Sequence, residues 1–165
     1  MQPPFDAIFD EAEHRYLKPD ELQEMRQYVF SLKDRVSTYQ MIRDRELSLM
    51  QQVADQIQYT MPDAELAALE RSLKNAMLSL RYCSMGMVLN DPSFVQNRLL
   101  GWLSDSMQIH NSSAIDRAVF RLIVQQLAQV LTSQQMELFQ PFLNLAQAVL
   151  PAPVEEEMLT VAGMF

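Results

Sequence analysis

Apolar side chains recur every three or four residues along most of this chain, which is the spacing of one face of an α-helix. Between Asp20 and Met61 the sequence contains no glycine or proline. The apolar positions within this run keep a helical spacing but no strict heptad: Val36, Tyr39, Ile42, Leu49, Val53 and Ile57. We therefore expect two or three helices here rather than a coiled coil, with bends near residues 37–38 and 43–45.

Prolines and capping residues divide the remainder into further helices. A short helix is expected over residues 6–15, and Pro19 suits the first turn of the next one. Asp63 follows Pro62 and is expected to cap a long helix, which residues 90–92 (Asn-Asp-Pro) end. Further helices are expected over residues 94–107, from Ser113 onward, and from a capping box at residues 132–135 to Leu150. The predicted fold class is all-α.

Composition bounds the function. The 165 residues suit one domain with a hydrophobic core, and the net charge is -8. No cluster of Lys and Arg is present to neutralise phosphates, so we expect no nucleic-acid partner. No apolar run reaches the length of a membrane span, and the first residues show no signal-peptide pattern. The single cysteine, Cys83, excludes an intrachain disulfide and a cysteine-based zinc site.

Catalytic chemistry lacks its parts in this sequence. Cys83 stands in a helical stripe, with no local nucleophile signature and with His14 and His110 far away along the chain. Glu11 and His14 have the Glu-x-x-His spacing of di-iron sites, but the second such motif is missing. Three glycines cannot supply a phosphate-binding loop. We expect neither an enzyme nor a metal site.

Two motifs carry a resemblance to a known family. Residues 12–22 read Ala-Glu-His-Arg-Tyr-Leu-Lys-Pro-Asp-Glu-Leu, and a Leu80-Arg81-Tyr82 motif is followed by Met-Gly-Met-Val-Leu-Asn-Asp at residues 85–91. The first resembles the N-terminal helical hairpin of phycobiliprotein subunits, the light-harvesting globins of cyanobacteria and red algae. The second resembles the end of their pigment-bearing helix, and the likeness is nearest to allophycocyanin. It implies a globin-like domain over residues 1–150, in which residues 1–33 form a hairpin of two extra helices.

The resemblance also implies a pigment site, which is degenerate in this chain. Ser72, Lys74 and Asn75 stand where the family has the bilin-bearing cysteine, an arginine and an aspartate. A serine hydroxyl is far less nucleophilic than a thiolate, and Asn75 carries no charge for a protonated tetrapyrrole. Cys83 lies eleven residues further on, about 16 Å along a helix, so we do not expect it to substitute. We expect no covalent bilin. Noncovalent binding of a bilin is the alternative.

The dimer-forming residues of the family are present. The resemblance implies that Glu11, Arg15 and Tyr16 of one subunit contact the region of Arg81 and Asp91 of another. It implies a homodimer, or a heterodimer with a phycobiliprotein-like subunit. The expected role is protein–protein interaction in assembly, degradation or regulation of phycobilisomes or photosystems. A noncovalent tetrapyrrole carrier or sensor is the alternative. The expected location is the cytoplasm, or the cytoplasmic face of the thylakoid.

Residues 151–165 lie beyond the resemblance. They join three glutamates, at positions 155–157, to apolar residues further on: Met158, Leu159, Val161, Met164 and Phe165. This pattern suits a tail that docks in a partner groove. A segment folded back on the domain and a frayed terminus are the other two interpretations.

Overall fold

The computed structural model describes residues 5–110 and 112–150, so the tail expected at residues 151–165 lies outside the described part. All regular secondary structure in the described residues is α-helical, which confirms the predicted fold class. The helices are α1 (Asp6–Asp10), α2 (Pro19–Thr60), α3 (Leu66–Leu89), α4 (Pro92–His110), α5 (Ser113–Val130) and α6 (Ser133–Val149).

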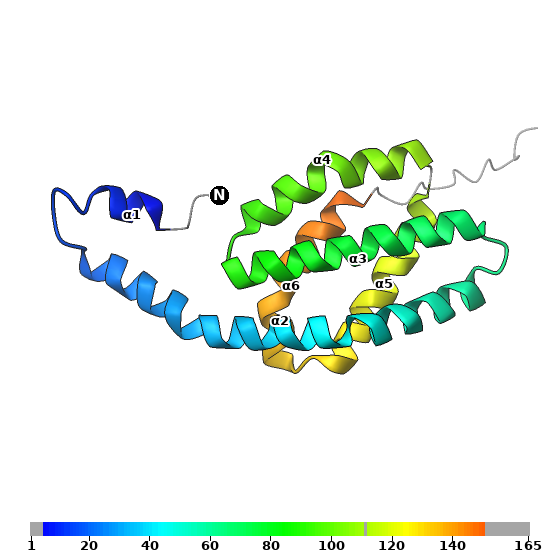
Figure 1. Cartoon of the computed structure of the whole chain (residues 1–165), viewed down its shortest axis with the longest axis horizontal. Coiled ribbons are helices and arrows are strands. Elements are labelled where there is room, and N and C mark those ends of the chain that lie inside the picture. The colour runs from blue at the N-terminus through cyan, green and yellow to red at the C-terminus, as the bar shows by residue number, and fades with distance from the viewer. Residues whose placement is uncertain (1–4, 111, 151–165) are drawn as a thin grey trace, which may run out of the picture.

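Helix α3 is the centre of the bundle, because it packs against α2, α4, α5 and α6. Figure 1 shows α2 crossing the bundle along one side, with α1 and the first turns of α2 projecting beyond the other helices. We call this projecting part, residues 5–34, the arm. The core between the helices is apolar and includes Leu49, Val53, Ile57, Leu80, Met87, Val95, Leu99, Val119, Leu127 and Phe139.

Helix α2 is continuous over 42 residues, so the division of this run into two or three helices was wrong. Its buried positions follow one another at steps of three, four or seven residues: Arg35, Thr38, Ile42, Leu49, Val53 and Ile57. The Thr38 hydroxyl donates to the carbonyl of Asp34 at 2.7 Å, so it is satisfied without breaking the helix. The polar residues at 37–38 and 43–45 therefore do not interrupt α2.

The first helix is shorter than the one expected over residues 6–15. Helix α1 ends at Asp10, and residues 11–14 form turns, followed by a bend at Arg15, instead of extending the helix. Short helices are marginal on their own, and here the Arg15 side chain reaches over to Glu21 at the start of α2. The Phe5 ring, which is buried, packs edge-on against Tyr28 with 5.0 Å between ring centroids. This contact joins the start of the chain to α2.

A buried arginine fastens α2 to the end of α3. Arg35 is only 2% exposed, and its guanidinium donates to the carbonyls of Val88 and Tyr28 and to the Ser31 hydroxyl. It also lies over the Tyr28 ring, 4.4 Å from the centroid. Val88 is in the last turn of α3, where free carbonyls and the helix dipole favour a cation. The arm is thus anchored to the bundle at one defined point.

The turn from α3 to α4 forms as the Asn-Asp-Pro sequence predicted. Asn90 takes the left-handed conformation, with φ 52°, and ends α3. The Asp91 carboxylate accepts from the Ser93 backbone N–H at 2.9 Å, and Pro92 opens α4. Just before this turn, Gly86 lies so close to Val95 of α4 that a β-carbon has no room.

Other helix starts agree with the sequence in part. The capping box at α6 is confirmed, with reciprocal bonds between Thr132 and Gln135 of 3.2 and 3.0 Å. Asp63 does not cap α3, which starts three residues later, at Leu66, with Glu65 at the N-cap position. Residues 108–110, which were expected to lie beyond the helix of residues 94–107, are the last residues of α4. Helix α5 begins at Ser113, and the hydroxyl of Ser112 just before it donates to the buried Asp116 carboxylate at 2.6 Å.

We predict that Gly86→Ala destabilises the protein by about 1 to 3 kcal/mol, because the new methyl group overlaps Val95 and approaches a Phe142 ring carbon at 3.2 Å. Gly101→Ala is the matched control, since its β-carbon meets nothing within 4 Å. The control should gain about 0.5 to 1 kcal/mol from helix propensity. Thermal unfolding followed by circular dichroism measures both. Equal melting temperatures for the two variants would contradict the close α3–α4 packing.

Candidate protein-interaction site

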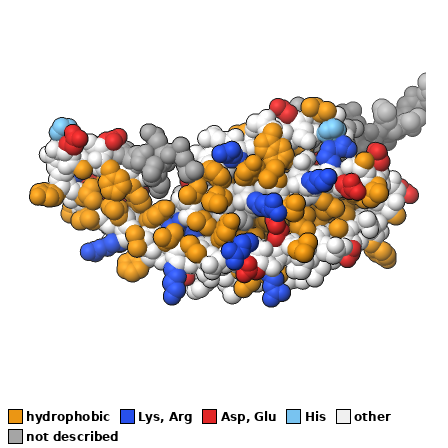
Figure 2. Space-filling view, in the orientation of Figure 1, with side chains coloured by type: hydrophobic (Ala, Val, Ile, Leu, Met, Phe, Trp, Pro, Cys, Tyr) orange, Lys and Arg blue, Asp and Glu red, His pale blue; other side chains and the backbone are white. Residues whose placement is uncertain are grey.

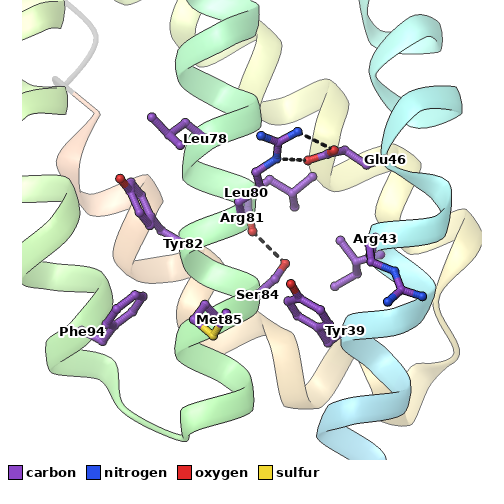
Figure 3. Close-up of a pocket in the computed structure, with 11 residues that line it drawn as sticks. Tyr39, Arg43, Glu46, Leu78, Leu80, Arg81, Tyr82, Ser84, Met85 and Phe94 are labelled. Carbon is purple, nitrogen blue, oxygen red and sulfur yellow. Dashed lines mark hydrogen bonds and ion pairs between the residues drawn. The ribbon is translucent and has the colours of Figure 1, made fainter. Parts of the chain in front are cut away.

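A groove of about 500 Å³ runs over the outward face of α3, with walls from α2 and α4. Figure 3 shows it with the side chains that line it. Tyr39, Ile42, Arg43 and Glu46 come from α2, Phe94 comes from α4, and Leu78, Leu80, Arg81, Tyr82, Ser84 and Met85 come from α3. Aromatic and aliphatic groups predominate, so the groove can bury an apolar segment or ligand.

The charged groups of the groove are two arginines and one glutamate. Arg81 makes a two-pronged contact with Glu46, from Nε at 2.7 Å and from Nη2 at 2.8 Å. These hydrogen bonds raise the pKa of Arg81, so it stays charged. Arg43 pairs instead with its neighbour Asp44, which is not part of the lining, at 2.9 Å. The lining therefore carries a net charge of +1, that is, two arginines less one glutamate.

The tip of the arm carries the opposite balance. Arg15 binds Glu21 through two hydrogen bonds, of 2.7 and 2.9 Å, and binds Glu11 at 2.6 Å. Hydrogen bonds from Arg15, and then from the Lys18 backbone N–H, lower the pKa of Glu21 to about 2. Two carboxylates thus surround one guanidinium. Tyr16 beside them is 98% exposed.

The arm also presents apolar side chains to solvent. Figure 2 shows hydrophobic side chains gathered over this projecting end of the molecule. The exposed members are Phe9, Leu22, Val29, Phe30 and Leu32, and Phe30 is 79% exposed. An exposed apolar surface of this kind marks an interaction site more often than an ordinary solvated face.

The interface residues predicted from the sequence lie at three places in the structure: the arm tip, the groove and the α3–α4 turn. Glu11, Arg15 and Tyr16 lie together at the arm tip. Arg81 lies in the groove, whereas Asp91 is outside the groove lining, in the α3–α4 turn. The sequence analysis missed the other groove residues, including Tyr39, Arg43, Glu46, Tyr82 and Phe94. For Arg43 and Glu46 the signal was their spacing of three residues, which places both on one face of α2.

A protein-family model described as "Phycobilisome protein" matches residues 9–150. The chain belongs to the phycobilisome protein family. Its helical bundle is the globin-like fold of the phycobiliproteins, as the resemblance implied. No curated protein matches the chain. None of the helices in residues 5–110 and 112–150 is long and apolar enough to cross a membrane.

Members of the phycobilisome protein family normally hold a covalent bilin, and the residues around Ser72 do not fit one. Ser72 is 1% exposed, and its hydroxyl has no hydrogen-bond partner. It faces a cavity of only about 10 Å³, closed in part by Leu103, Met107 and Phe120. Asn75 lines the same cavity and donates to Ser106 at 3.4 Å, while Lys74 is exposed. A tetrapyrrole needs hundreds of Å³, so this cavity cannot hold one.

The described residues offer no cluster of metal ligands, and their one thiol is buried. No group of three or more His, Cys, Asp or Glu residues among them could hold a metal ion. The thiol of Cys83 is buried and donates to the Phe142 carbonyl at 3.3 Å. Burial raises the pKa of Cys83 from 9.0 to about 12, which keeps the thiol protonated and unreactive at neutral pH.

We predict that Cys83 resists alkylation by iodoacetamide at pH 8 in the native protein and reacts readily in urea. A pKa near 12 in place of 9.0 leaves roughly a thousandfold less thiolate at this pH, before steric protection is counted. For the same reason, the contribution of the Cys83 thiol to the free energy of unfolding is constant below about pH 9 and decreases as the pH rises towards 12. In that range the thiol loses its proton in the unfolded chain and keeps it in the folded chain. Intact mass spectrometry follows the reaction. Rapid labelling of the folded chain contradicts the buried position.

Proposed function

We propose that this chain is a phycobiliprotein-like subunit without covalent pigment, which acts through protein–protein contact in the assembly, degradation or regulation of phycobilisomes or photosystems. Family membership supports the setting, since phycobilisomes lie at the thylakoid surface. The small volume of the cavity at Ser72, about 10 Å³, argues against light harvesting by a bilin bound there. No catalytic activity belongs to this function.

One observation carries the proposal: an apolar arm projects from the bundle, with an acidic tip, while the bundle has an apolar groove of opposite net charge. A free monomer leaves Val29 and Phe30 of the arm in water. A partner that covers the arm gains the hydrophobic free energy of their burial. Both halves of the contact are on one chain, so two copies can pair isologously, each arm lying on the other bundle. A phycobiliprotein-like subunit with a similar groove would serve as a heterologous partner.

We predict that Arg81→Glu weakens self-association at least about tenfold, because the arm tip would then meet two acids, the introduced carboxylate and Glu46. Arg121→Glu makes the same charge change at an exposed position of α5 outside the groove, and it should leave association unchanged. Sedimentation velocity over a concentration series measures both. A dimeric protein whose association does not respond to Arg81→Glu has a different interface.

We predict that no bilin becomes attached when the chain is produced together with bilin-synthesis enzymes and bilin lyases. Zinc-induced fluorescence on a denaturing gel detects any covalent bilin, and an allophycocyanin subunit serves as the positive control. Ser72→Cys should also stay unlabelled, because the thiol would face a cavity of only about 10 Å³ and Asn75 would still lack a charge. A fluorescent wild-type band contradicts this proposal and makes Cys83 the residue to replace next.

A second candidate function is a carrier or sensor of a noncovalently bound tetrapyrrole. It is favoured by the volume of the α2–α3 groove, about 500 Å³, and by its aromatic lining with two arginines that can meet carboxylates. A visible absorption band that elutes with the protein after bilin is added would support this candidate. Loss of that band in Arg81→Glu would assign it to the groove.

A further inference from the structure

The arm tip and the groove each contain an ion pair within the single chain. They differ in how easily a carboxylate can leave its arginine. At the arm tip, Arg15 has two carboxylates. Glu21 accepts two hydrogen bonds from Arg15 and a third from the Lys18 backbone N–H at 2.7 Å. Its side chain is only 19% exposed. Glu11 is 59% exposed and meets Arg15 through one oxygen only. Glu11 can therefore leave while Glu21 still neutralises Arg15.

The groove has the complementary arrangement. Glu46 is the carboxylate in the groove lining, and both of its oxygens are engaged by Arg81. An acid arriving from another chain thus finds Arg81 occupied. The second guanidinium of the groove, Arg43, stands three residues before Glu46 on the same face of α2. Its own pair with Asp44 is exposed on both sides, so that pair contributes little and can be given up.

We propose that Glu46 is a built-in competitor for the docking acid: in the free chain it holds Arg81, and it turns to Arg43 when Glu11 of a second copy binds Arg81. The inference rests on the proposed arm-to-groove contact and adds the residue that sets its strength. Two arginines and one glutamate in the groove accommodate one additional carboxylate with full charge balance. The surplus carboxylate at the arm tip, Glu11, supplies it. The occupant of the groove is accordingly the arm of another copy of this chain.

Glu46→Gln tests the competition, because glutamine keeps the size of the side chain and removes the charge that holds Arg81. The association constant should rise about three- to fivefold, the range expected when a partly exposed competing pair is removed. Asp55→Asn is the matched control. It removes one negative charge from the same helix, at an exposed position outside the groove, so it reports the general loss of repulsion between chains of net charge -8. The control should change association less than twofold.

Two further variants separate competition from simple positioning of Arg81. Arg43→Gln removes the group that receives Glu46 on docking, and it should weaken association about two- to fivefold without lowering the melting temperature. In a Glu11→Gln background, Glu46→Gln should give no more gain than Asp55→Asn, because the arriving charge is absent. Sedimentation velocity gives the association constants, and circular dichroism verifies that each variant is folded.

The outcomes also separate this inference from the proposed function. If Arg81→Glu dissociates the dimer but Glu46→Gln associates no better than Asp55→Asn, the arm-to-groove contact stands and Glu46 is not a competitor. If Glu46→Gln associates more weakly than the wild type, Glu46 positions Arg81, and the inference is overturned. A wild type and a Glu46→Gln variant that both stay monomeric overturn inference and homodimer together. A monomeric wild type with a dimeric Glu46→Gln variant supports the inference in its strongest form.

Discussion

The geometry of the molecule depends on the guanidinium of Arg35. A charged group that is 2% exposed is costly to bury unless its hydrogen bonds are satisfied. Here carbonyl and hydroxyl oxygens and the face of Tyr28 satisfy it. Because the Val88 carbonyl belongs to the last turn of α3, the same group that ties down α2 also stabilises the α3 terminus. Phe5 packs on Tyr28, so the start of the chain is linked to the bundle through the same ring.

Because α2 is continuous, the anchoring of Arg35 to the bundle also fixes the position of the arm. The helix has 42 residues and is therefore roughly 63 Å long. Its second half lies on the bundle through Leu49, Val53 and Ile57, whereas its first turns carry the exposed arm. A helix without an interruption transmits its direction, so packing in the core sets where Glu11 and Tyr16 are presented. A flexible joint near residues 37–38 would instead require a partner to order the arm, at a cost in binding free energy.

Local signals in the sequence were sufficient for some helix ends and insufficient for packing. The capping box at Thr132 and the turn at Asn90 each involve residues a few positions apart, so the sequence contains all of their chemistry. The division of α2 into two or three helices was wrong because polar residues were taken as helix boundaries, although Arg35 and Thr38 are buried in the fold. At the site, the motif predicted Arg81, but its partner Glu46 is 35 positions away and is brought to it by the packing of α2 on α3. The burial of Ser72 likewise depends on α4 and α5, which no local pattern describes.

The two faces of α3 separate the small cavity at Ser72 from the open groove at Arg81. Ser72 and Arg81 are nine residues apart, which is about 180° around a helix, so they point to opposite sides. On the inner side, Leu103, Met107 and Phe120 close the space next to Ser72, and their packing stabilises the bundle. On the outer side, Arg81 and Tyr82 line an open groove. A substitution that fills the inner cavity therefore acts on a different face of α3 from the groove that we propose as the docking site, in which Glu46 lies.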